Sequence, residues 1–385
     1  MQARLQDLVR KHLPSALDLR HDLHRIPEPA GKEIKTSQRI REALAALPLD
    51  VRPPFLGTDV VALLDSGRPG PNVTLRADID ALPISEETGS LYASTHAGFM
   101  HACGHDGHAA MLYGALRVLC DLRDDLPRGS VRFVFQPGEE VAALARPLLA
   151  AGALENPRAD FCAALHGWPG VPHGCISTRP GAVMAAAGFF EISITGKGGH
   201  GAVPEKALNP IPIASRIVDA LRRDCPPICT VCRFDAGANT NIIPASARLL
   251  GTTRFLDEET GRRIEDALRS TVERICREEG AAYAIDYAVP YPVTATTPRG
   301  EALARIAAES SLAPGRFVPM ATSSMTCEDF AYYLQGRDGV YAHLGLGDCP
   351  PLHNSHFEFD DSVLASGMAY LATLALQALR DLPTT

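Results

Sequence analysis

The sequence predicts an α/β protein in which a mostly parallel mixed sheet, flanked by helices, is interrupted by an inserted ferredoxin-like α+β domain. Strand and helix patterns alternate through the first half of the chain, which is typical of parallel sheets. A later segment follows the order strand-helix-strand-strand-helix-strand. The 385 residues exceed the usual size of one domain. We therefore assign residues 1–183 and 294–385 to a main domain and residues 184–293 to the inserted domain.

The main domain begins with a helix that ends near Ile26, because Pro27, Pro29 and Gly31 then interrupt the helical pattern. Further along, clusters of polar residues directly follow apolar strands. Since the carboxyl ends of parallel strands meet at one edge of a sheet, these clusters predict a site along that edge. The expected strands are 60–64, 72–77, 131–135 and 163–166, and the later helices are 34–47, one from a His-rich turn to about 122, and 300–311.

The inserted domain opens with Phe189–Thr195, whose alternation of apolar and polar residues is typical of a half-solvated strand. In the predicted arrangement two helices cover only one face of the sheet. The uncovered face or edge needs a partner, so we expect a homodimer or higher homo-oligomer through this domain. The other expected strands are 228–234, 247–255 and 282–289, and the helices are 210–223 and 258–278.

The composition is that of an ordinary globular protein, with 46% apolar and 21% charged residues. The net charge of -8 argues against nucleic acid or an anionic membrane as the main partner, because both attract clustered positive charge. We find no run of about 18 uncharged apolar residues that would predict a membrane span. The N-terminal segment lacks the apolar core of a signal peptide, so we expect a cytoplasmic protein.

The ten cysteines are scattered and do not form the dense framework of a small disulfide-rich domain. Cys229 and Cys232 have the spacing of a zinc knuckle, with Cys225 nearby. They lie in an expected strand, however, where residues three apart point to opposite faces. We therefore interpret these three as buried structural cysteines.

The densest group of metal-binding residue types is His101-Ala-Cys-Gly-His-Asp-Gly-His108, just before a helix. Neutral imidazole and thiolate bind divalent transition metals, and carboxylate joins them at catalytic sites. Cys103 and His105 are two residues apart in an irregular turn, so both side chains could converge on one ion. The alternative is a polar loop of solvated histidines, which the density of ligand types disfavours.

Two more strand ends carry potential ligands. Glu139 and Glu140 follow an apolar strand, and adjacent side chains leave the backbone in different directions. One glutamate can therefore bind a metal while the other acts as a base. His166 ends another apolar strand, two residues before the only tryptophan of the chain, which could form a wall of an apolar acyl pocket.

Late in the chain, His353 and His356 offer one further imidazole ligand. Together with Cys103, His105, Glu140 and His166, this makes five ligands, more than one tetrahedral zinc ion needs when a position stays open for water. A site for two metal ions about 3.5–4 Å apart would use all five.

These motifs resemble one family, the amidohydrolases that include hippurate hydrolase, N-acyl-amino-acid deacylases, auxin-conjugate hydrolases and N-acetyldiaminopimelate deacetylases. Aminoacylase and glutamate carboxypeptidase are more distant relatives. The resemblance runs in order from about His21 to His353 and so covers nearly the whole chain. It rests on Arg76-Ala-Asp-Ile-Asp-Ala-Leu-Pro-Ile, Met100-His-Ala-Cys-Gly-His-Asp-Gly-His, Phe135-Gln-Pro-Gly-Glu-Glu, Leu165-His-Gly-Trp-Pro-Gly, Gly196-Lys-Gly-Gly-His, Asn241-Ile-Ile-Pro, Gly251-Thr-Thr-Arg, Cys327-Glu-Asp-Phe and Leu352-His-Asn.

The resemblance implies a dinuclear centre with Cys103 in the bridging position. It selects His353 over His356, because the family's ligand directly follows the Leu of its motif. Zinc or manganese is expected, with cobalt or nickel as alternatives. The matched ligands are Cys103, His105, Glu140, His166 and His353.

Other matched residues surround this centre. The resemblance implies that Glu139 is the general base and that Asp80 orients a ligand. Asp106 is expected in a supporting position, together with His101 and His108.

In the inserted domain, His200 matches a histidine that in relatives reaches the other subunit's site and polarises the scissile carbonyl. Asn241 and Arg254 match groups that hold the substrate's carboxylate, for which the planar guanidinium is well shaped.

Four departures from the family pattern bear on the substrate. Val141–Arg146 replaces a Gly-rich run, and Glu205 stands where His is frequent. Asn209 replaces the usual Asp, and Cys327 replaces a common Ser. None of them removes a matched ligand or the base.

The sequence thus predicts a metal-dependent amidohydrolase that cleaves a hippurate-like or N-acetyl amino acid to a carboxylate and a free amino acid. A water activated by two metal ions attacks, with Glu139 as general base and His200 stabilising the oxyanion. The nearest alternative is a dipeptidase or carboxypeptidase that uses the same metals. A catalytically silent metal- or ligand-binding protein is disfavoured, because a binding module need not keep Glu139, His200 and Arg254 together.

Overall fold

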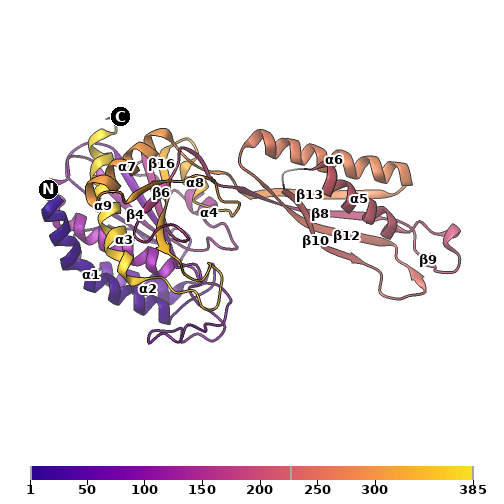
Figure 1. The fold of residues 1–385 in the computed structure, drawn as a ribbon, viewed down its shortest axis with the longest axis horizontal. Coiled ribbons are helices and arrows are strands. Elements are labelled where there is room, and N and C mark those ends of the chain that lie inside the picture. The colour runs from indigo at the N-terminus through magenta and orange to yellow at the C-terminus, as the bar shows by residue number, and fades with distance from the viewer. Residues whose placement is uncertain (1, 226–227, 384–385) are drawn as a thin grey trace. The chain divides into compact units, whose positions relative to one another are not determined.

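The computed structural model describes residues 2–225 and 228–383, which form two compact units (Figure 1). The first unit comprises Met1–Val183, Ala295–Thr322 and Asp329–Thr385, and the second comprises Met184–Thr294 and Ser323–Glu328. Assigning Ser323–Glu328 to the main domain was wrong. The backbone N–H of Ala185 donates to the carbonyls of Ser324 and Thr326, both at 3.0 Å, and so ties this short segment to the second unit.

The first unit is built on an eight-stranded sheet in the order β1-β2-β4-β3-β5-β16-β6-β15. The four central strands, β4, β3, β5 and β16, run parallel, whereas β2 joins β4 and β6 joins β16 antiparallel. The predicted mostly parallel, mixed sheet is confirmed. The strands of this unit and its border are β1 (Asp50–Val51), β2 (Val60–Asp65), β3 (Asn72–Asp78), β4 (Ser130–Gln136), β5 (Phe161–Pro169), β6 (Ile176–Thr178), β7 (Gly181–Met184), β14 (Thr294–Thr296), β15 (Phe317–Pro319) and β16 (Asp338–Gly347).

One continuous apolar core joins this sheet to its helices. Helix α3 packs against α1 and α9, and α9 also packs against α7 (Figure 1). Strands β3 and β4 are buried along their whole length, as expected for strands covered on both faces. The helices of the first unit are α1 (Gln2–Arg25), α2 (Ile34–Leu44), α3 (His105–Asp121), α4 (Ala145–Ala150), α7 (Pro298–Ser311), α8 (Ala331–Leu334) and α9 (Leu364–Asp381).

The C-terminal helix α9 was not among the expected elements, and neither was β16. Over Asp361–Asp381 the chain is long and apolar enough to cross a membrane by length and composition alone. However, 72% of its most apolar window is buried inside the structure, against α1, α3 and α7. This packing is that of a core helix in a globular unit.

The second unit has a four-stranded antiparallel sheet in the order β10-β12-β8-β13. Helices α5 and α6 pack on one of its faces through a separate apolar core. Because the chain runs β8-α5-β10-β12-α6-β13, the predicted ferredoxin-like arrangement is confirmed. The elements are β8 (Ala186–Thr195), β9 (Gly199–His200), α5 (Pro210–Asp224), β10 (Ile228–Ala236), β11 (Ile242–Ile243), β12 (Ser246–Phe255), α6 (Glu258–Glu279) and β13 (Ala282–Tyr291).

The three cysteines at the end of α5 and in β10 are not all buried, so that part of the prediction was wrong. Cys225 is buried and Cys229 is half-buried against the core of the unit, but Cys232 is exposed. The physical reason is that β10 is an edge strand whose pairing with β12 is irregular between Val231 and Arg233.

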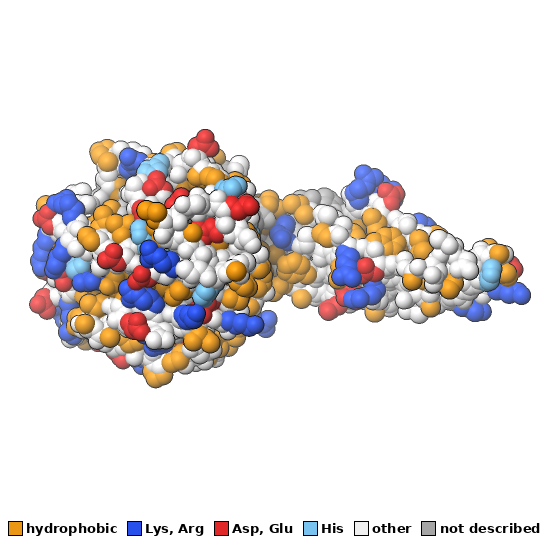
Figure 2. Space-filling model, turned by 90° about the horizontal axis from the view of Figure 1, so that it is seen from below, with side chains coloured by type: hydrophobic (Ala, Val, Ile, Leu, Met, Phe, Trp, Pro, Cys, Tyr) orange, Lys and Arg blue, Asp and Glu red, His pale blue; other side chains and the backbone are white. Residues whose placement is uncertain are grey.

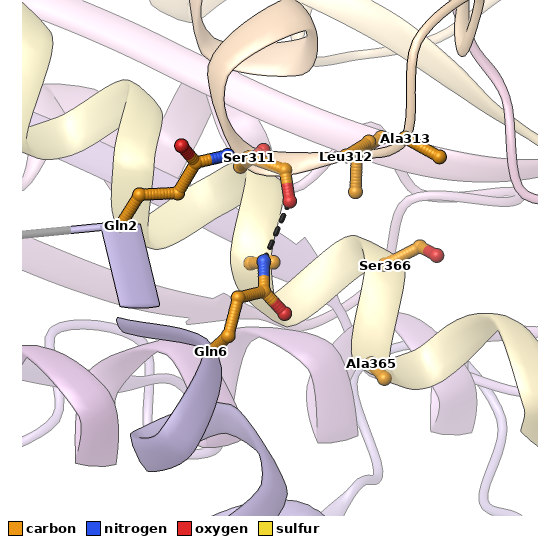
Figure 3. Close-up of a pocket in the computed structure, with 8 residues that line it drawn as sticks. Gln2, Gln6, Ser311, Leu312, Ala313, Ala365 and Ser366 are labelled. Atoms are coloured by element: carbon orange, nitrogen blue, oxygen red, sulfur yellow. Dashed lines mark hydrogen bonds between the residues drawn. The ribbon is translucent and has the colours of Figure 1, made fainter. Parts of the chain in front are cut away.

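The first unit also carries a surface hollow that is lined without charged side chains. On the face drawn in Figure 2, basic and acidic side chains are interspersed with hydrophobic ones. A hollow of about 350 Å³ lies between the start of α1, the end of α7 and the start of α9 (Figure 3), where the amide of Gln6 donates to the carbonyl of Ser311 at 2.6 Å. Its lining side chains are amides, hydroxyls and alkyl groups, none of them ionisable.

Candidate metal centre

The predicted site residues of the first unit gather where β3, β4 and β5 end and α3 begins. Cys103 lies in the turn before α3, and Gly104 caps that helix with a φ of 83°, a conformation that favours glycine. His105 is the first residue of α3, and His166 lies near the end of β5. Glu140 follows β4, so segments far apart in sequence meet at one edge of the sheet.

The five predicted ligands form a continuous group of donor atoms. Single donor atoms of Cys103, His105 and Glu140 lie within 4.8 Å of one another. On one side, Cys103 Sγ is 3.5 Å from His166 Nε2. On the other, Glu140 Oε1 is 3.1 Å from His353 Nε2. The structure therefore brings all five residues together.

Asp80 holds two of these ligands in place. Its carbonyl oxygen lies 2.9 Å and its Oδ1 3.2 Å from Nδ1 of His105, and its Oδ2 accepts the backbone N–H of Glu140 at 3.1 Å. Because Nδ1 of His105 is engaged by Asp80, Nε2 is left to face the other donors. This is the arrangement in which a carboxylate orients a metal-binding imidazole.

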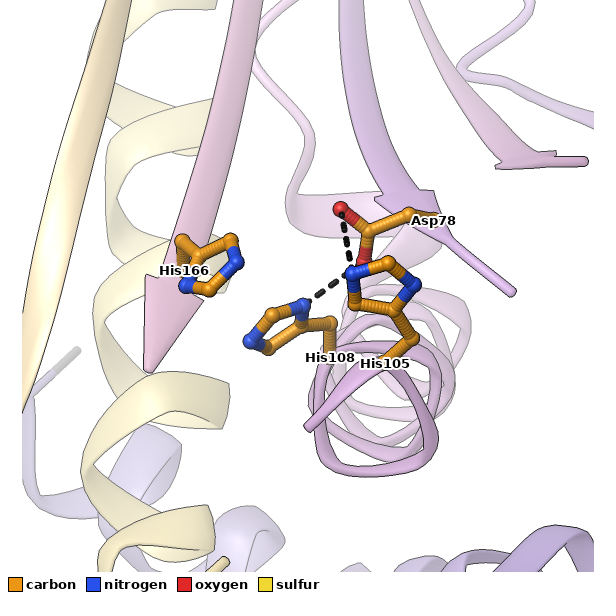
Figure 4. A group of neighbouring side chains, drawn as sticks. All are labelled: Asp78, His105, His108 and His166. Atoms are coloured by element: carbon orange, nitrogen blue, oxygen red, sulfur yellow. Dashed lines mark hydrogen bonds and ion pairs between the residues drawn. The ribbon is translucent and has the colours of Figure 1, made fainter. Parts of the chain in front are cut away.

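His166 and His108 differ in what their ring nitrogens can do (Figure 4). Nδ1 of His166 lies 2.7 Å from the carbonyl of Gly167, which leaves Nε2 toward Cys103. In His108, Nδ1 is 2.7 Å from Asp78 Oδ1, while Nε2 accepts the backbone N–H of Gly167 at 2.8 Å. Both nitrogens of His108 are therefore occupied, so it supports the site without a free ligand atom.

His353 rather than His356 faces the group. His353 has a φ of 63°, and its N–H donates to the carbonyl of Ala102 at 2.8 Å. Both rings are exposed, but Nδ1 of His356 lies 3.0 Å from the carbonyl of Glu87.

The pKa values of three of the predicted ligands also fit a site for a cation. Burial, reinforced by Glu140 and Glu139, raises the pKa of the Cys103 thiol well above its usual range. Burial opposes charge on His105, but Asp78 and Asp80 outweigh it and raise its pKa to about 10. Burial lowers the pKa of His166 well below its usual value, so this imidazole is neutral. A divalent cation would replace the protons on the first two residues.

Nε2 of His105 is buried and makes no hydrogen bond in the part of the chain that the structure describes. Oε1 of Glu140 and Oδ2 of Asp78 lie 3.7 and 3.8 Å from it, beyond hydrogen-bond distance. A buried polar atom without a partner is costly, and coordination to a metal ion would satisfy this one. The soft thiolate and imidazole ligands, together with a carboxylate, fit a divalent transition metal.

The predicted base and supporting residues lie around this group. Glu139 is 7% exposed and close enough to Cys103 to affect its thiol. Asp106 faces α1 instead: its Oδ2 is 2.8 Å from Nδ1 of His24 and 3.2 Å from Nε of Arg20. His101 is buried beside them, and burial lowers its pKa to about 4.

Asp78 was missed by the sequence analysis. It is the last residue of β3, and its carboxylate bridges His108 and Nη1 of Arg76, the latter at 2.8 Å. Its position two residues before Asp80, in the motif that begins at Arg76, was the available signal.

The three predicted residues of the second unit lie in two places. His200 and Asn241 are exposed neighbours. His200 pairs with Ile242, and the N–H of Gly201 donates to the backbone carbonyl of Asn241 at 2.8 Å. Arg254 is near the end of β12, where its guanidinium lies 5.9 Å from the ring centre of Phe189.

Comparison with known proteins agrees with this geometry. The N-acetylcysteine deacetylase of Bacillus subtilis is 33% identical over 375 residues, covering 95% of this chain and 97% of the relative. The thermostable carboxypeptidase 1 of Saccharolobus solfataricus is 34% identical over 393 residues, covering 97% and 98%. The crystal structure of the Bacillus subtilis YXEP protein, described as a dinuclear metal binding peptidase, has a TM-score of 0.87 at 32% identity and covers 97% of this chain and 100% of that one.

The family described as Peptidase family M20/M25/M40 matches residues 74–377, which include all five candidate ligands. The chain therefore belongs to this peptidase family and is a metal-dependent hydrolase.

Proposed function

We propose that this enzyme hydrolyses the amide bond of N-acyl amino acids, releasing a carboxylate and a free amino acid. The observation that carries the proposal is the convergence of Cys103, His105 and Glu140 within 4.8 Å, with Glu139 buried directly beside them. Similarity to an N-acetylcysteine deacetylase supports this substrate class over longer peptides.

In this proposal the five predicted ligands would hold two divalent metal ions, which when bound would polarise the amide carbonyl and lower the pKa of a water molecule. Glu139 accepts the proton of the attacking water and delivers it to the leaving amine. Asp80 fixes the positions of His105 and Glu140 for this step through its hydrogen bonds to them. The thiolate and imidazole ligands favour zinc, and manganese, cobalt or nickel are the alternatives to test.

Arg254 and Asn241 would hold the substrate's carboxylate, and His200 would polarise the scissile carbonyl. Arg254 pairs with Ala187 at the beginning of β8, whereas His200 follows the other end of that strand at Thr195. Eight residues of extended strand span about 25 Å. One small substrate cannot bridge that distance, and Asn241 lies beside His200. Both points support a homo-oligomer in which His200 and Asn241 of one copy serve the site that contains Arg254 of a second copy.

The nearest rival, a dipeptidase or carboxypeptidase, is supported by the similarity to a carboxypeptidase. One substrate panel tests both activities. It contains N-acetyl and N-benzoyl amino acids, dipeptides, and longer peptides with a free C-terminus. Each substrate is assayed with enzyme that has been loaded with one metal at a time. The proposal expects kcat/KM to be highest for an N-acyl amino acid. Preference for dipeptides or peptides would favour the rival.

We further propose that the enzyme works in the cytoplasm. The cysteines of the described residues form no disulfide with one another, which suits a reducing compartment.

A further inference from the structure

The loop that carries Glu139 and Glu140 has little regular structure of its own. It runs from the end of β4 at Gln136 to the start of α4 at Ala145. Within it, Gly138 has a φ of 64°, and the N–H of Leu144 donates to the Gly138 carbonyl at 3.0 Å. A loop of this kind depends on outside contacts for a fixed conformation.

Asp329 binds both ends of this loop. Its two carboxylate oxygens accept the side-chain amide of Gln136 at 2.8 and 2.9 Å, and its Oδ2 accepts the backbone N–H of Ala145 at 2.9 Å. Asp329 is fully buried, and Nη2 of Arg76 lies 3.0 Å from its Oδ1 as the countercharge. One carboxylate thus fixes the two points where the loop leaves regular structure.

Glu33 binds the middle of the same loop, from the segment between α1 and α2. Its Oε1 accepts the backbone N–H of Gly138 at 2.9 Å and that of Gly31 at 2.8 Å, and its Oε2 accepts the hydroxyl of Thr58 at 3.0 Å. The side chain is fully buried. Gly138 directly precedes Glu139, so this bond acts one residue from the proposed base.

We propose that Glu33 and Asp329 are positioning residues that fix the loop conformation in which Glu139 and Glu140 can act. The inference rests on the proposed hydrolase function. The hydrogen bonds described for Glu33 reach Gly31, Thr58 and Gly138, so it acts through the loop backbone. A misplacement of about 1 Å at a reacting group lowers rate by about a hundredfold, so loss of either carboxylate should act mainly on kcat.

The two carboxylates differ in what an amide can replace. In Glu33→Gln, the amide oxygen can still accept hydrogen bonds from both backbone N–H groups. The NH₂ group can donate to the Thr58 hydroxyl, which can rotate to accept. In Asp329→Asn, either orientation sets an NH₂ against a donor, because both oxygens accept N–H groups. The amide should therefore rescue the first position but not the second.

The test compares Glu33→Met, Glu33→Gln and Asp329→Asn in the metal-loaded full chain. A matched control is Glu42→Met, an exposed carboxylate on α2. We expect kcat to fall by about tenfold to a hundredfold in Glu33→Met and Asp329→Asn, with KM within about threefold of wild type. Glu33→Gln and Glu42→Met should keep nearly normal kcat. If Glu33→Met does not fold, Glu33→Asp, which withdraws the acceptor by one methylene, takes its place.

A second readout does not need activity. Hydrogen exchange should show that the Gly138 amide is protected in wild type and in Glu33→Gln but exchanges faster in Glu33→Met. Zinc affinity, measured by competition with a chelator, should also be lower in Glu33→Met. Normal kcat together with unchanged Gly138 exchange in Glu33→Met would overturn the inference. A wild-type enzyme inactive on the whole substrate panel would instead overturn the proposed function, and the exchange and zinc measurements would still decide the role of Glu33.

Discussion

The backbone N–H of His353 donates a 2.8 Å hydrogen bond to the carbonyl of Ala102, the residue before Cys103. This single bond joins two candidate ligand-bearing turns that are 250 residues apart in sequence. It also accompanies the left-handed backbone of His353, whose φ is 63°. Such backbone strain in a residue other than glycine is concentrated at functional sites.

This geometry predicts different outcomes for two substitutions of His353. Asparagine tolerates a left-handed backbone far better than alanine does. The free energy of unfolding of His353→Asn should therefore be close to that of wild type, whereas that of His353→Ala should be lower by about 1 kcal/mol. Both variants lose the imidazole and should bind zinc more weakly. Urea unfolding of the metal-free proteins and zinc titration measure the two effects separately. Equal zinc affinity in wild type and both variants would remove His353 from the ligand set.

His108 should behave as a supporting residue rather than a ligand. Its ring nitrogens are taken by Asp78 and by the N–H of Gly167, which adjoins His166. We expect His108→Ala to bind metal at the same stoichiometry but about 10–100-fold more weakly. The exposed His356 provides the matched control, since His356→Ala should leave affinity unchanged. Loss of one whole equivalent of metal in His108→Ala would show that it is a ligand.

His24 predicts a specific dependence of stability on pH. Burial opposes its charge, but the carboxylate of Asp106, with help from Glu86 and against the charge of Arg20, raises its pKa to about 9. A group with a raised pKa stabilises the fold fully below its unfolded value near 6.5, and that contribution is lost as pH rises toward 9. The free energy of unfolding should therefore fall over this range, by up to about 3 kcal/mol. His101, also buried nearby, stays neutral across it because burial lowers its pKa to about 4.

The check is the difference between wild type and His24→Gln in urea unfolding at pH 6 and pH 9. Taking the difference removes contributions that both proteins share. The advantage of wild type should be largest at pH 6 and shrink by pH 9. An advantage that grows with pH would contradict the charged pair at His24.

Mixing subunits tests whether His200 acts in a second copy. His200→Ala and Glu139→Gln should each be nearly inactive alone. If the homo-oligomer is a dimer, random mixing should recover about a quarter of wild-type activity, because half the dimers then contain one complete site. Recovery should require both variants and should be absent when His200→Ala is mixed with His200→Ala. No recovery, with mixed dimers verified, would place His200 in its own subunit's site.

Most of the regular structure could be predicted from periodicity and strand-end polar residues, as at β3, β4 and α6. The exceptions have physical reasons. Helix α9 is apolar on most sides because it is buried, so its main signal is not the narrow apolar stripe that marks surface helices. Strand β16 is buried through most of its length and likewise shows no alternation.

At the site, ligand types and strand-end positions were enough to place Cys103, His105 and Glu140 together. The contacts that orient them were not predictable, because several partners are backbone atoms, such as the carbonyl of Gly167 beside His166. Glu33 is an isolated acidic residue more than a hundred positions from the loop it holds, so no local pattern marks it.

The most direct test of the central claim is Glu139→Gln in metal-loaded enzyme. Glutamine keeps the size of the side chain but cannot accept a proton, so metal content should match wild type. Turnover of the best N-acyl amino acid should fall by about a hundredfold or more. Turnover near the wild-type level, at unchanged metal content, would contradict Glu139 as the general base.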